Sequence, residues 1–378
     1  MTTTHLDILH LTISPCDHER RIFNEAISAS KKGFTVKIVA LKTPDLPKEE
    51  QIENIPLTRI SIKNWKGGPL KFLSFNWKLW RYIRKLNFTV LHVHDVWVLP
   101  AAVLANIFGK KKVVYDAHEY IRGLEIFSRK KLSGIIWKFT EYVLIKKIDC
   151  LISINEDHQK LFRENYPEIP KSVVLKNYPR LQQIESSKAK PANSVREKVI
   201  IFQGILKKGR GLVQAIEAMQ NLQSGILRII GYGELKDELE NKVRKSDLEE
   251  KIEFLGKVPL ADLLSETQKA RAGLVLFEPL SLNYTYASPN KFFEYVMSGT
   301  PIIASNIPTL KVLNQEFEVA LLVDPFKPDS ISRAMDQLLT DDNLWLRLHQ
   351  NCLLASKRWN WEAQEDKLIK IYENLLKS

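Results

Sequence analysis

The chain has 378 residues, of which 44% are hydrophobic and 26% are charged, and its formal net charge is +12. This length favours two domains of ordinary size, and the composition is typical of a folded protein with buried cores. The lack of an uninterrupted apolar run of membrane-spanning length argues against a transmembrane protein, and three distant cysteines without a CxxC pair argue against disulfides and zinc knuckles.

The positive charge is confined to the first half of the sequence. Residues 1–190 carry 32 Lys and Arg against 19 Asp and Glu, whereas residues 191–378 carry 24 against 25. A basic surface of this kind suits an anionic partner, such as a membrane face, a lipid phosphate or nucleic acid. The first residues have no basic n-region and no small-residue cleavage site, so we expect a cytoplasmic protein that can also lie at the cytoplasmic membrane face.

Short apolar runs alternate with helical patterns along the chain. In the first half, the runs expected to form strands are residues 7–13, 35–41, 90–93, 112–115, 150–154 and 172–175. In the second half they are residues 199–202, 226–230, 252–254, 272–277, 301–304 and 320–323. Continuous apolar strands that alternate with helices predict an α/β protein with parallel, doubly wound sheets.

The polar segment 181–198 separates the two sets of strands and is typical of an interdomain linker. We therefore predict two Rossmann-like domains, over residues 1–180 and 199–358, with a cleft between them. Ligands of such sheets bind at the carboxyl ends of the strands. Residues 359–378 are predicted to form an amphipathic helix that packs back toward the first domain.

The stretch ASPNKFFEY, residues 287–295, predicts a helix start with a conflict of charge. Ser288 is expected to be the N-cap and Pro289 the first helical residue. Lys291 would then lie in the first turn, where the helix dipole is already positive, so an anion such as a diphosphate is needed beside it. Glu294 lies one turn further and can accept hydrogen bonds from ribose hydroxyls. The alternative is a surface lysine and a glutamate on a solvated helix face.

Two further loops of the second half contain glycines after a predicted strand. Residues 202–211 include Gly204 and three basic residues, Lys207, Lys208 and Arg210, between a strand and a helix, which suits phosphate binding. This loop lacks the P-loop pattern, which argues against a nucleoside triphosphatase. Gly231 and Gly233 permit a close approach of the backbone to a ligand. A tight turn with solvated lysines and a plain loop are the respective alternatives.

The first half places histidines and carboxylates at two strand ends, in residues 92–95 and 116–119. These groups can hydrogen-bond sugar hydroxyls and transfer protons. They can alternatively bind a metal ion, as in a hydrolase, but the sequence shows no third compact group of ligands. His92 is interpreted as a structural residue that points away from His94.

Residues 71–88 form a basic amphipathic pattern, in which Leu73, Trp77, Trp80 and Ile83 share one helical face. We favour a helix that packs this face on the core and leaves its basic residues in water. The alternative is a helix at a membrane surface, which the basic residues at 129–131 and 146–147 also support.

The order and spacing of six motifs resemble those of retaining glycosyltransferase family 4, which has the GT-B fold. The motifs are residues 17–25 (D-x-R-x-x-x-E helix opening), 115–119 (DxHE), 207–211 (R…KG), 231–235 (GxGp(l)), 254–258 (FLGxV) and 288–301 (SPNKxFEYMAxGxP). The last motif is similar to a variant of bacterial polysaccharide-forming members. The resemblance covers nearly the whole chain.

The resemblance implies roles for individual residues. The implied catalytic residues are His118, Arg210 and Lys291. The implied donor-binding residues are Glu294, Ser288, Asn290, Gly204, Lys208, Gly231, Gly233, Val258 and Glu278. The candidates on the acceptor side are Asp17, Arg21, His94 and Asp95. The resemblance implies neither a metal ion nor any other cofactor, because the nucleotide sugar is a co-substrate.

The implied function is transfer of a sugar, with retention of configuration, from a nucleotide-diphosphate sugar to a cell-surface polysaccharide or a lipid-linked oligosaccharide. The sequence departs from the family at Tyr286, where the first of two paired glutamates is expected, and Glu278 can approach the donor sugar instead. Residues 14–16 also lack the glycine pair that usually follows the first strand.

Two alternative functions come from other classes. One is a metal-dependent hydrolase or nucleotide-sugar-processing enzyme that uses His94, Asp95, Asp116 and His118. The other is a catalytically silent scaffold that binds a nucleotide sugar. Nucleic-acid binding is disfavoured, because the aromatic residues form no RNA-binding signature.

Overall fold

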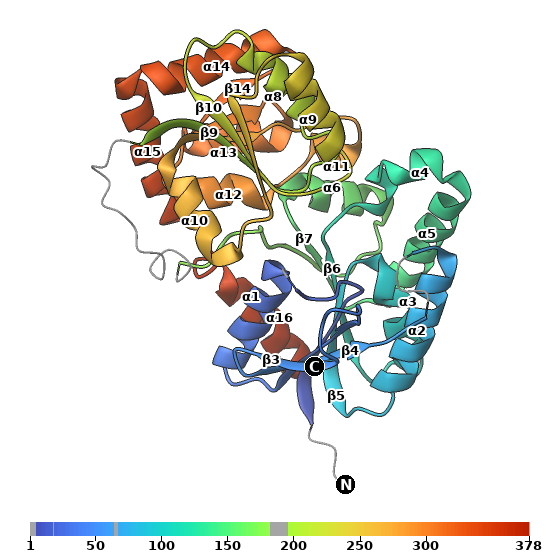
Figure 1. The fold of residues 1–378 in the computed structure, drawn as a ribbon. Coiled ribbons are helices and arrows are strands. Elements are labelled where there is room, and N and C mark those ends of the chain that lie inside the picture. The colour runs from blue at the N-terminus through green and yellow to red at the C-terminus, as the bar shows by residue number, and fades with distance from the viewer. Residues whose placement is uncertain (1–4, 18, 64–66, 182–195, 378) are drawn as a thin grey trace. The chain divides into compact units, whose positions relative to one another are not determined.

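The computed structural model describes residues 5–17, 19–63, 67–181 and 196–377, which form two compact units (Figure 1). The first unit comprises Met1–Lys176 and Gln364–Ser378, and the second comprises Asn177–Ala363. The predicted boundaries at residues 180 and 358 therefore move to 176 and 363. They move because Tyr178 and Trp359 are buried in a hydrophobic cluster of the second unit. Most of the predicted linker, residues 182–195, lies outside the described residues.

The first unit is built on an eight-stranded sheet with the order β3-β4-β2-β1-β5-β6-β7-β8. Its strands are β1 (Leu6–Leu11), β2 (Val36–Leu41), β3 (Glu49–Ile52), β4 (Ile55–Ile60), β5 (Phe88–His94), β6 (Lys112–Ala117), β7 (Cys150–Ser153) and β8 (Ser172–Val174). All described pairs are parallel except β3 and β4. The parallel sheet was predicted, and the edge hairpin of β3 and β4 was not.

Helices cover this sheet, and they come from both ends of the chain. They are α1 (Arg20–Lys31), α2 (Pro69–Ile83), α3 (Leu99–Ala105), α4 (Ile126–Arg129), α5 (Lys131–Leu144), α6 (Glu156–Asn165) and α16 (Glu365–Lys377). Three short 3₁₀ helices span Val96–Val98, Ile121–Gly123 and Ile145–Lys147. Helix α16 packs against α1 and β5, so the chain-terminal helix completes the first unit.

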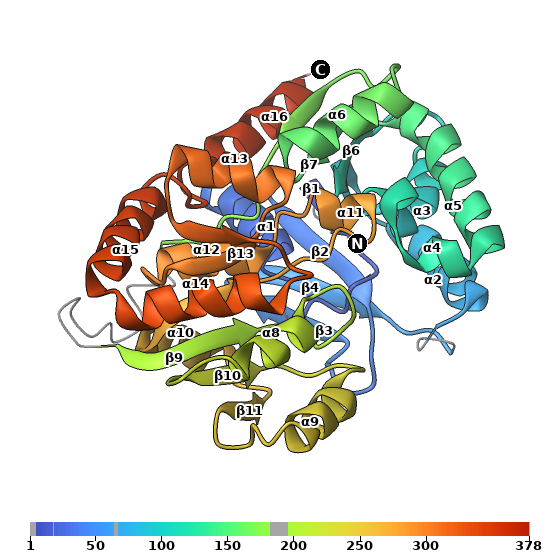
Figure 2. The same ribbon diagram turned by 90° about the horizontal axis from the view of Figure 1, so that it is seen from above.

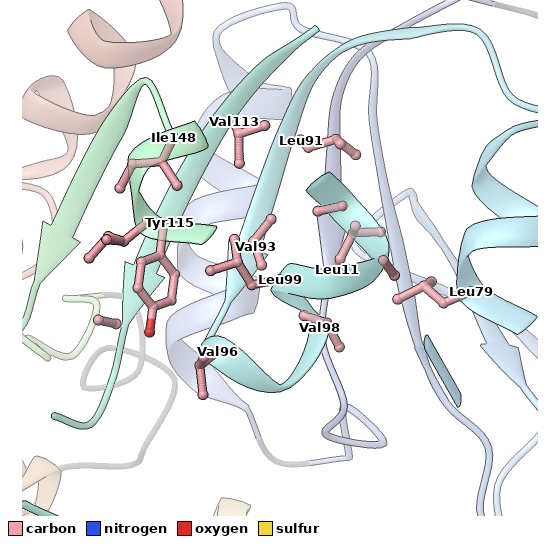
Figure 3. Close-up of a cluster of buried hydrophobic side chains, with 14 of the residues drawn as sticks. Leu11, Leu79, Leu91, Val93, Val96, Val98, Leu99, Val113, Tyr115 and Ile148 are labelled. Carbon is pink, nitrogen blue, oxygen red and sulfur yellow. The ribbon is translucent and has the colours of Figure 1, made fainter. Parts of the chain in front are cut away.

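The core of the first unit lies between the sheet and helices α2 and α3 (Figure 3). On α2, the buried residues are Phe75, Leu79 and Ile83, whereas Leu73 and Trp77 are exposed. The predicted buried face of this helix is therefore wrong for Leu73 and Trp77. The helix carries two apolar stripes at helical spacing, and packing against the core selects the one that begins at Phe75.

The second unit is built on a six-stranded sheet with the order β11-β10-β9-β12-β13-β14, in which every described pair is parallel. Its strands are β9 (Glu197–Gln203), β10 (Ile226–Ile230), β11 (Ile252–Gly256), β12 (Ala270–Val275), β13 (Ile302–Ser305) and β14 (Ala320–Val323). Its helices are α8 (Leu212–Met219), α9 (Lys236–Lys245), α10 (Leu260–Lys269), α11 (Leu282–Thr285), α12 (Asn290–Met297), α13 (Pro308–Glu316), α14 (Pro328–Thr340) and α15 (Asp342–Ser356).

Helices pack on both faces of this second sheet. Alternate residues of β9 enter two separate clusters: Ile200 and Phe202 join one with α8, α9 and α14, and Val199 and Ile201 join another with α12 and α13. Successive side chains of a strand point to opposite faces, so the sheet is covered on both sides and doubly wound, as predicted. Within the described part of the chain, we find no helix with both the length and the apolar character to span a membrane.

Candidate active site

Each sheet has a point where the order of its strands reverses along the chain. In the first sheet this point lies between β1 and β5, and in the second between β9 and β12. Ligands of open α/β sheets bind beside the carboxyl ends of strands at such points. The predicted site residues follow the ends of these strands and of the neighbouring strands β6, β10 and β11, so each unit is described in turn.

Asp116 is the centre of the first-unit site. The guanidinium of Arg21, on α1, donates from Nε to Oδ2 and from Nη2 to Oδ1 of Asp116, each at 2.7 Å. Its Nη1 donates to the carbonyl of Leu175 at 2.8 Å. Both side chains of this pair are buried. Burial favours the neutral acid, but the charges of Arg21 and His118 outweigh it and hold the pKa of Asp116 well below its usual range.

His118 lies between two carboxylates and remains accessible to a ligand. Its Nε2 lies 2.8 Å from Oδ2 of Asp116, and its Nδ1 lies 3.7 Å from Oδ2 of Asp95. The side chain is 21% exposed. Burial opposes protonation, but the two carboxylates raise the pKa of His118 to about 9, so the imidazolium predominates at neutral pH.

Asp95 holds His118 from a constrained backbone position. Its φ angle of 64° is unusual for a residue other than glycine, and its Oδ1 accepts the backbone N–H of His118 at 3.0 Å. Backbone conformations of this kind persist only where the surrounding structure holds them in place, and they are common at functional sites. Burial raises the pKa of Asp95 to about 6, although His118 opposes this shift.

The raised pKa of His118 predicts a pH dependence. The pKa in the folded protein, about 9, lies above the ordinary value of 6.5, so this histidine contributes stability that is complete below about pH 6.5 and is lost as the pH rises through 9. We expect an NMR titration of its imidazole protons to show a midpoint near 9. Asp95→Asn should lower this midpoint, because one of the charges that raise it is removed. A midpoint at or below 6.5 would contradict the assigned charge state.

Three buried histidines, His10, His92 and His94, stack on one another beneath His118. The rings of His92 and His94 lie 4.6 Å apart with their planes 13° from parallel, and His10 stacks on both. The prediction that His92 points away from His94 is therefore wrong, since residues two apart in a strand share a face. Nε2 of His94 lies 2.9 Å from Nδ1 of His10, and Nδ1 of His92 lies 2.5 Å from the hydroxyl of Tyr372.

The first unit contains more potential metal ligands than the sequence indicated. Ligand atoms of His10, Glu25, His92 and His94 lie within 4.8 Å of one another, and so do those of His94, Asp116 and His118. The expectation that further ligand groups were missing is therefore wrong. The imidazole planes of His10, His92 and His94, however, lie within 22° of parallel, so their lone pairs do not converge on one point. Both oxygens of Asp116 also accept hydrogen bonds from Arg21. The arrangement fits a hydrogen-bonded charge network better than a metal site.

Asp17 is the remaining acceptor-side residue of the first unit. It is exposed in the loop between β1 and α1, next to residue 18, which lies outside the described residues. In the same loop the hydroxyl of Ser14 donates to Glu19 at 2.7 Å.

In the second unit, Lys291 is a buried cation at the start of α12. It lies in the first helical turn, as predicted, but it is only 9% exposed, and its Nζ sits 3.7 Å from the centre of the Phe202 ring. Helix α12 begins at Asn290 with Pro289 at the N-cap, so the predicted capping role of Ser288 is wrong. Ser288 is buried just before the helix, and Asn290 is exposed.

A second cation acts on Lys291. Burial is the largest cause that lowers the pKa of Lys291 well below its ordinary value, and the charge of Arg210 lowers it further, whereas Glu294 opposes the shift. The guanidinium of Arg210 lies over the ring of Phe277 at 4.2 Å. Two cations at the positive end of a helix form a site that favours an anion.

The loop that carries Arg210 is held by Glu278. Oε1 of Glu278 accepts the backbone N–H of Gly211 at 3.2 Å, and the backbone N–H of Glu278 donates to the carbonyl of Gly209 at 3.2 Å. Within the same loop, Nζ of Lys207 lies over the Tyr284 ring, and Lys208 is exposed. Glu278 thus shapes the basic loop, a function that was not predicted for it.

Glu294 is fixed in place by a residue that sequence reasoning missed. Nε2 of Gln203 donates to Oε2 of Glu294 at 2.8 Å, and Oε1 of Gln203 accepts the hydroxyl of Thr267 at 2.9 Å. Gln203 ends the apolar strand β9, and a polar residue at the carboxyl end of a buried strand is the signal that identifies it. Tyr286, which replaces the expected glutamate, ends the short helix α11.

The glycine turns of this unit pack backbone against backbone. A Cβ atom on Gly231 would lie 1.8 Å from the carbonyl oxygen of Gly204, and one on Gly233 would lie 2.2 Å from that of Leu206. Both glycines also have positive φ angles, 144° and 158°. We predicted that the backbone at these glycines approaches a ligand closely. The structure shows that it approaches the backbone of the neighbouring loop. Val258 packs against the hydrophobic cluster below these loops.

Two models of known protein families match this chain. Residues 18–177 match the family model of Glycosyltransferase Family 4, and residues 183–353 match that of Glycosyl transferases group 1. This chain belongs to the glycosyltransferases of family 4. The enzyme therefore transfers a glycosyl group, and the hydrolase and silent-scaffold alternatives are set aside.

Three known proteins illustrate this relationship. The glycosyltransferase is 26% identical to D-inositol 3-phosphate glycosyltransferase of Corynebacterium glutamicum, over 94% of this chain and 91% of the relative. It is 28% identical, over 64% of this chain and 65% of the relative, to an enzyme of Campylobacter jejuni, N-acetylgalactosamine-N,N'-diacetylbacillosaminyl-diphospho-undecaprenol 4-alpha-N-acetylgalactosaminyltransferase. The structure of Anabaena HepE in complex with UDP and glucose matches with a TM-score of 0.76 at 14% identity, over 98% of this chain and all of the other. This last match shows the GT-B fold.

Proposed function

We propose that this glycosyltransferase moves a sugar from a nucleotide-diphosphate sugar to a lipid-linked oligosaccharide or a nascent cell-surface polysaccharide, with retention of configuration. The observation that carries the proposal is the buried ammonium of Lys291, which faces the charge of Arg210 at the start of α12. A diphosphate beside these groups would relieve their mutual repulsion and restore favourable charge to the helix start.

The donor is assigned to the second unit. Lys291, Arg210 and the first N–H groups of α12 bind the diphosphate, and Glu294, oriented by Gln203, accepts hydrogen bonds from the ribose. The segment around Val258 binds the base, and Gly204 and Lys208 lie along the donor. The complex of HepE with UDP and glucose supports this class of donor.

When the bond at the sugar breaks, negative charge develops on the diphosphate, where Lys291, Arg210 and the N–H groups of α12 can stabilise it. The bond between the anomeric carbon and the phosphate oxygen breaks, and its electron pair leaves with the diphosphate. The acceptor oxygen attacks from the same face, and the acceptor proton passes to the departing phosphate oxygen. Two cations and the helix N–H groups stabilise the charge that develops on the diphosphate, which makes a metal ion unnecessary.

The first unit supplies the groups that act on the sugar and the acceptor. The imidazolium of His118 can donate a hydrogen bond to an oxygen of the donor sugar, while Asp116 and Asp95 hold its orientation. The acceptor side includes Asp17, Arg21, His94 and Asp95. Acceptors joined to a lipid diphosphate are anionic, which suits the basic first half of the chain. The diphospho-undecaprenol acceptor named for the Campylobacter relative supports this class. The basic first half is our reason for proposing a cytoplasmic enzyme at the membrane face.

The donor assignment predicts a stabilising effect of nucleotides. We expect the thermal midpoint of the enzyme to rise with at least one of UDP, GDP, ADP and their sugar conjugates, since saturation at 100 times Kd adds about 2.7 kcal/mol of stability. Glu294→Gln should abolish the rise given by the nucleoside diphosphate but retain part of that given by inorganic diphosphate. No rise with any nucleotide would contradict the proposal. Sugar transfer that is lost in the presence of a chelator would contradict its metal-independent form.

A further inference from the structure

Helix α5 buries a carboxylate and exposes a row of apolar side chains. Its residue Glu141 is fully buried, and its two carboxylate oxygens accept hydrogen bonds from the hydroxyls of Tyr115 at 2.8 Å and Tyr166 at 2.5 Å. The exposed side of the same helix is apolar and consists of Leu132, Ile135, Ile136, Phe139, Tyr142 and Val143. A surface helix of a globular protein normally turns its apolar stripe inward, so this stripe needs another explanation.

Two neighbouring helices extend this apolar surface. Leu70, Leu73 and Trp77 of α2 are exposed, and so are Leu104, Ile107 and Phe108 at the end of α3. Helix α3 packs against both α2 and α5, and the three helices lie side by side in both views (Figures 1 and 2). We call these exposed residues of α2, α3 and α5 the α2–α5 face. Large exposed apolar side chains gathered on neighbouring helices are typical of an interaction site.

The α2–α5 face rests on a packed aromatic cluster, so it is a fixed part of the first unit. The ring of Phe72, on α2, lies 5.1 Å from that of Trp137, on α5, and both rings contact Trp97. The exposed side chains next to this cluster are large: Phe139 is 66% exposed and Trp77 is 57% exposed. A surface of preorganised aromatic and aliphatic side chains can bind without a large ordering cost.

Positive charge surrounds the α2–α5 face, and negative charge is lacking. Residues 54–94 contain no Asp or Glu, and residues 126–148 contain only Glu141, which is buried. The exposed basic residues on and beside the three helices are Lys78, Arg81, Arg84, Lys110, Lys130 and Lys131. Lysine and arginine can extend their charged ends into a headgroup layer while their stems cover apolar surface. A second copy of the chain would bring the same positive rim against this one, which disfavours self-association.

We propose that the α2–α5 face docks on a lipid bilayer that contains anionic lipid, with α5 lying in the membrane plane. The apolar side chains enter the interfacial layer, and the basic rim contacts the anionic headgroups. This inference rests on the proposed location at a membrane face and deepens it by naming the docking surface, but it requires neither a particular donor nor a particular acceptor.

Vesicle flotation of the full-length enzyme tests the docking surface. We expect the enzyme to float with vesicles of phosphatidylcholine and phosphatidylglycerol, to float poorly with phosphatidylcholine alone, and to be released by high salt. The double variant Ile135→Asp/Phe139→Asp should bind the anionic vesicles at least about tenfold more weakly, since each substitution removes an exposed apolar side chain that would enter the bilayer and adds charge repulsion.

A matched control separates this surface from general surface changes. Val312→Asp alters an exposed apolar residue on α13 of the second unit, and it should bind vesicles as the wild type does. Circular dichroism and the thermal shift with nucleotide should be unchanged in all of these variants, because the substituted side chains are exposed and distant in sequence from the site residues. Equal vesicle binding by the double variant and the wild type would overturn the proposal. So would a stable dimer in solution that the double variant converts to a monomer.

Discussion

Lys291→Met is expected to lower the rate of sugar transfer by about 100- to 1,000-fold, while the thermal midpoint of the empty enzyme stays unchanged or rises. In the proposed mechanism, the ammonium of Lys291 stabilises the negative charge that develops on the departing diphosphate. In the empty enzyme the same ammonium is buried beside Arg210 at the positive end of α12, where it lacks compensating charge apart from Glu294. Burying a cation in this way costs stability, which a methionine of similar length does not.

The sign of the stability change can be checked against pH. The pKa of Lys291 in the folded protein lies below its ordinary value of 10.5, so protonation favours the unfolded chain. The loss of folding stability caused by burying Lys291 is therefore present at neutral pH, and it disappears above the ordinary pKa of lysine. Turnover with saturating donor and thermal unfolding without donor measure the two effects. Lys311→Met, at an exposed position on α13, is the matched control and should change neither. A variant of Lys291 that loses stability but keeps normal turnover would assign this residue to packing alone.

Arg21→Met is expected to destabilise the first unit by about 3–5 kcal/mol, the usual cost of removing one partner of a buried ion pair. The substitution leaves the carboxylate of Asp116 in the interior without its two hydrogen bonds from Arg21 at 2.7 Å, and it leaves Glu25 without a cation at 3.3 Å. Urea unfolding of the full chain, followed by tryptophan fluorescence, measures the loss in the transition of the first unit.

Two further variants test whether the loss of stability comes from the buried charge of Asp116, which Arg21→Met leaves without its guanidinium partner. Arg21→Lys restores a positive charge but not the forked pair of donors, so it should recover part of the stability. Arg21→Met/Asp116→Asn removes both charges and should be more stable than Arg21→Met alone. Arg81→Met, at an exposed position on α2, should be nearly neutral. A loss below about 1 kcal/mol for Arg21→Met, within the range of exposed pairs, would contradict a buried structural role.

The strands and the charge conflict at Lys291 could be predicted because their signals are local. Continuous apolar runs identified the parallel strands, and the position of Lys291 in a helical turn followed from neighbouring residues. The hairpin of β3 and β4 was missed because β3 is a polar, exposed edge strand and because the turn uses Glu53 and Asn54, both with positive φ angles, rather than an Asn-Gly pair.

The missed site residues depend on contacts between distant parts of the sequence. His10 pairs with His92 through the register of β1 and β5, and Gln203 reaches Glu294 across 91 residues. The exposed apolar stripe of α5 was missed for a related reason. A helical pattern does not show that Glu141 is buried, because this depends on its hydrogen bonds with the hydroxyls of Tyr115 and Tyr166.

The return of α16 to the first unit has a consequence for the order in which the protein is made. Tyr372 contacts His92 across 280 residues, and Glu365 accepts the hydroxyl of Ser28 at 2.6 Å. On the ribosome, residues 1–176 therefore emerge long before the helix that covers their histidine stack. The second unit, whose residues are contiguous, can complete its fold first. The first unit is thus completed only after the second.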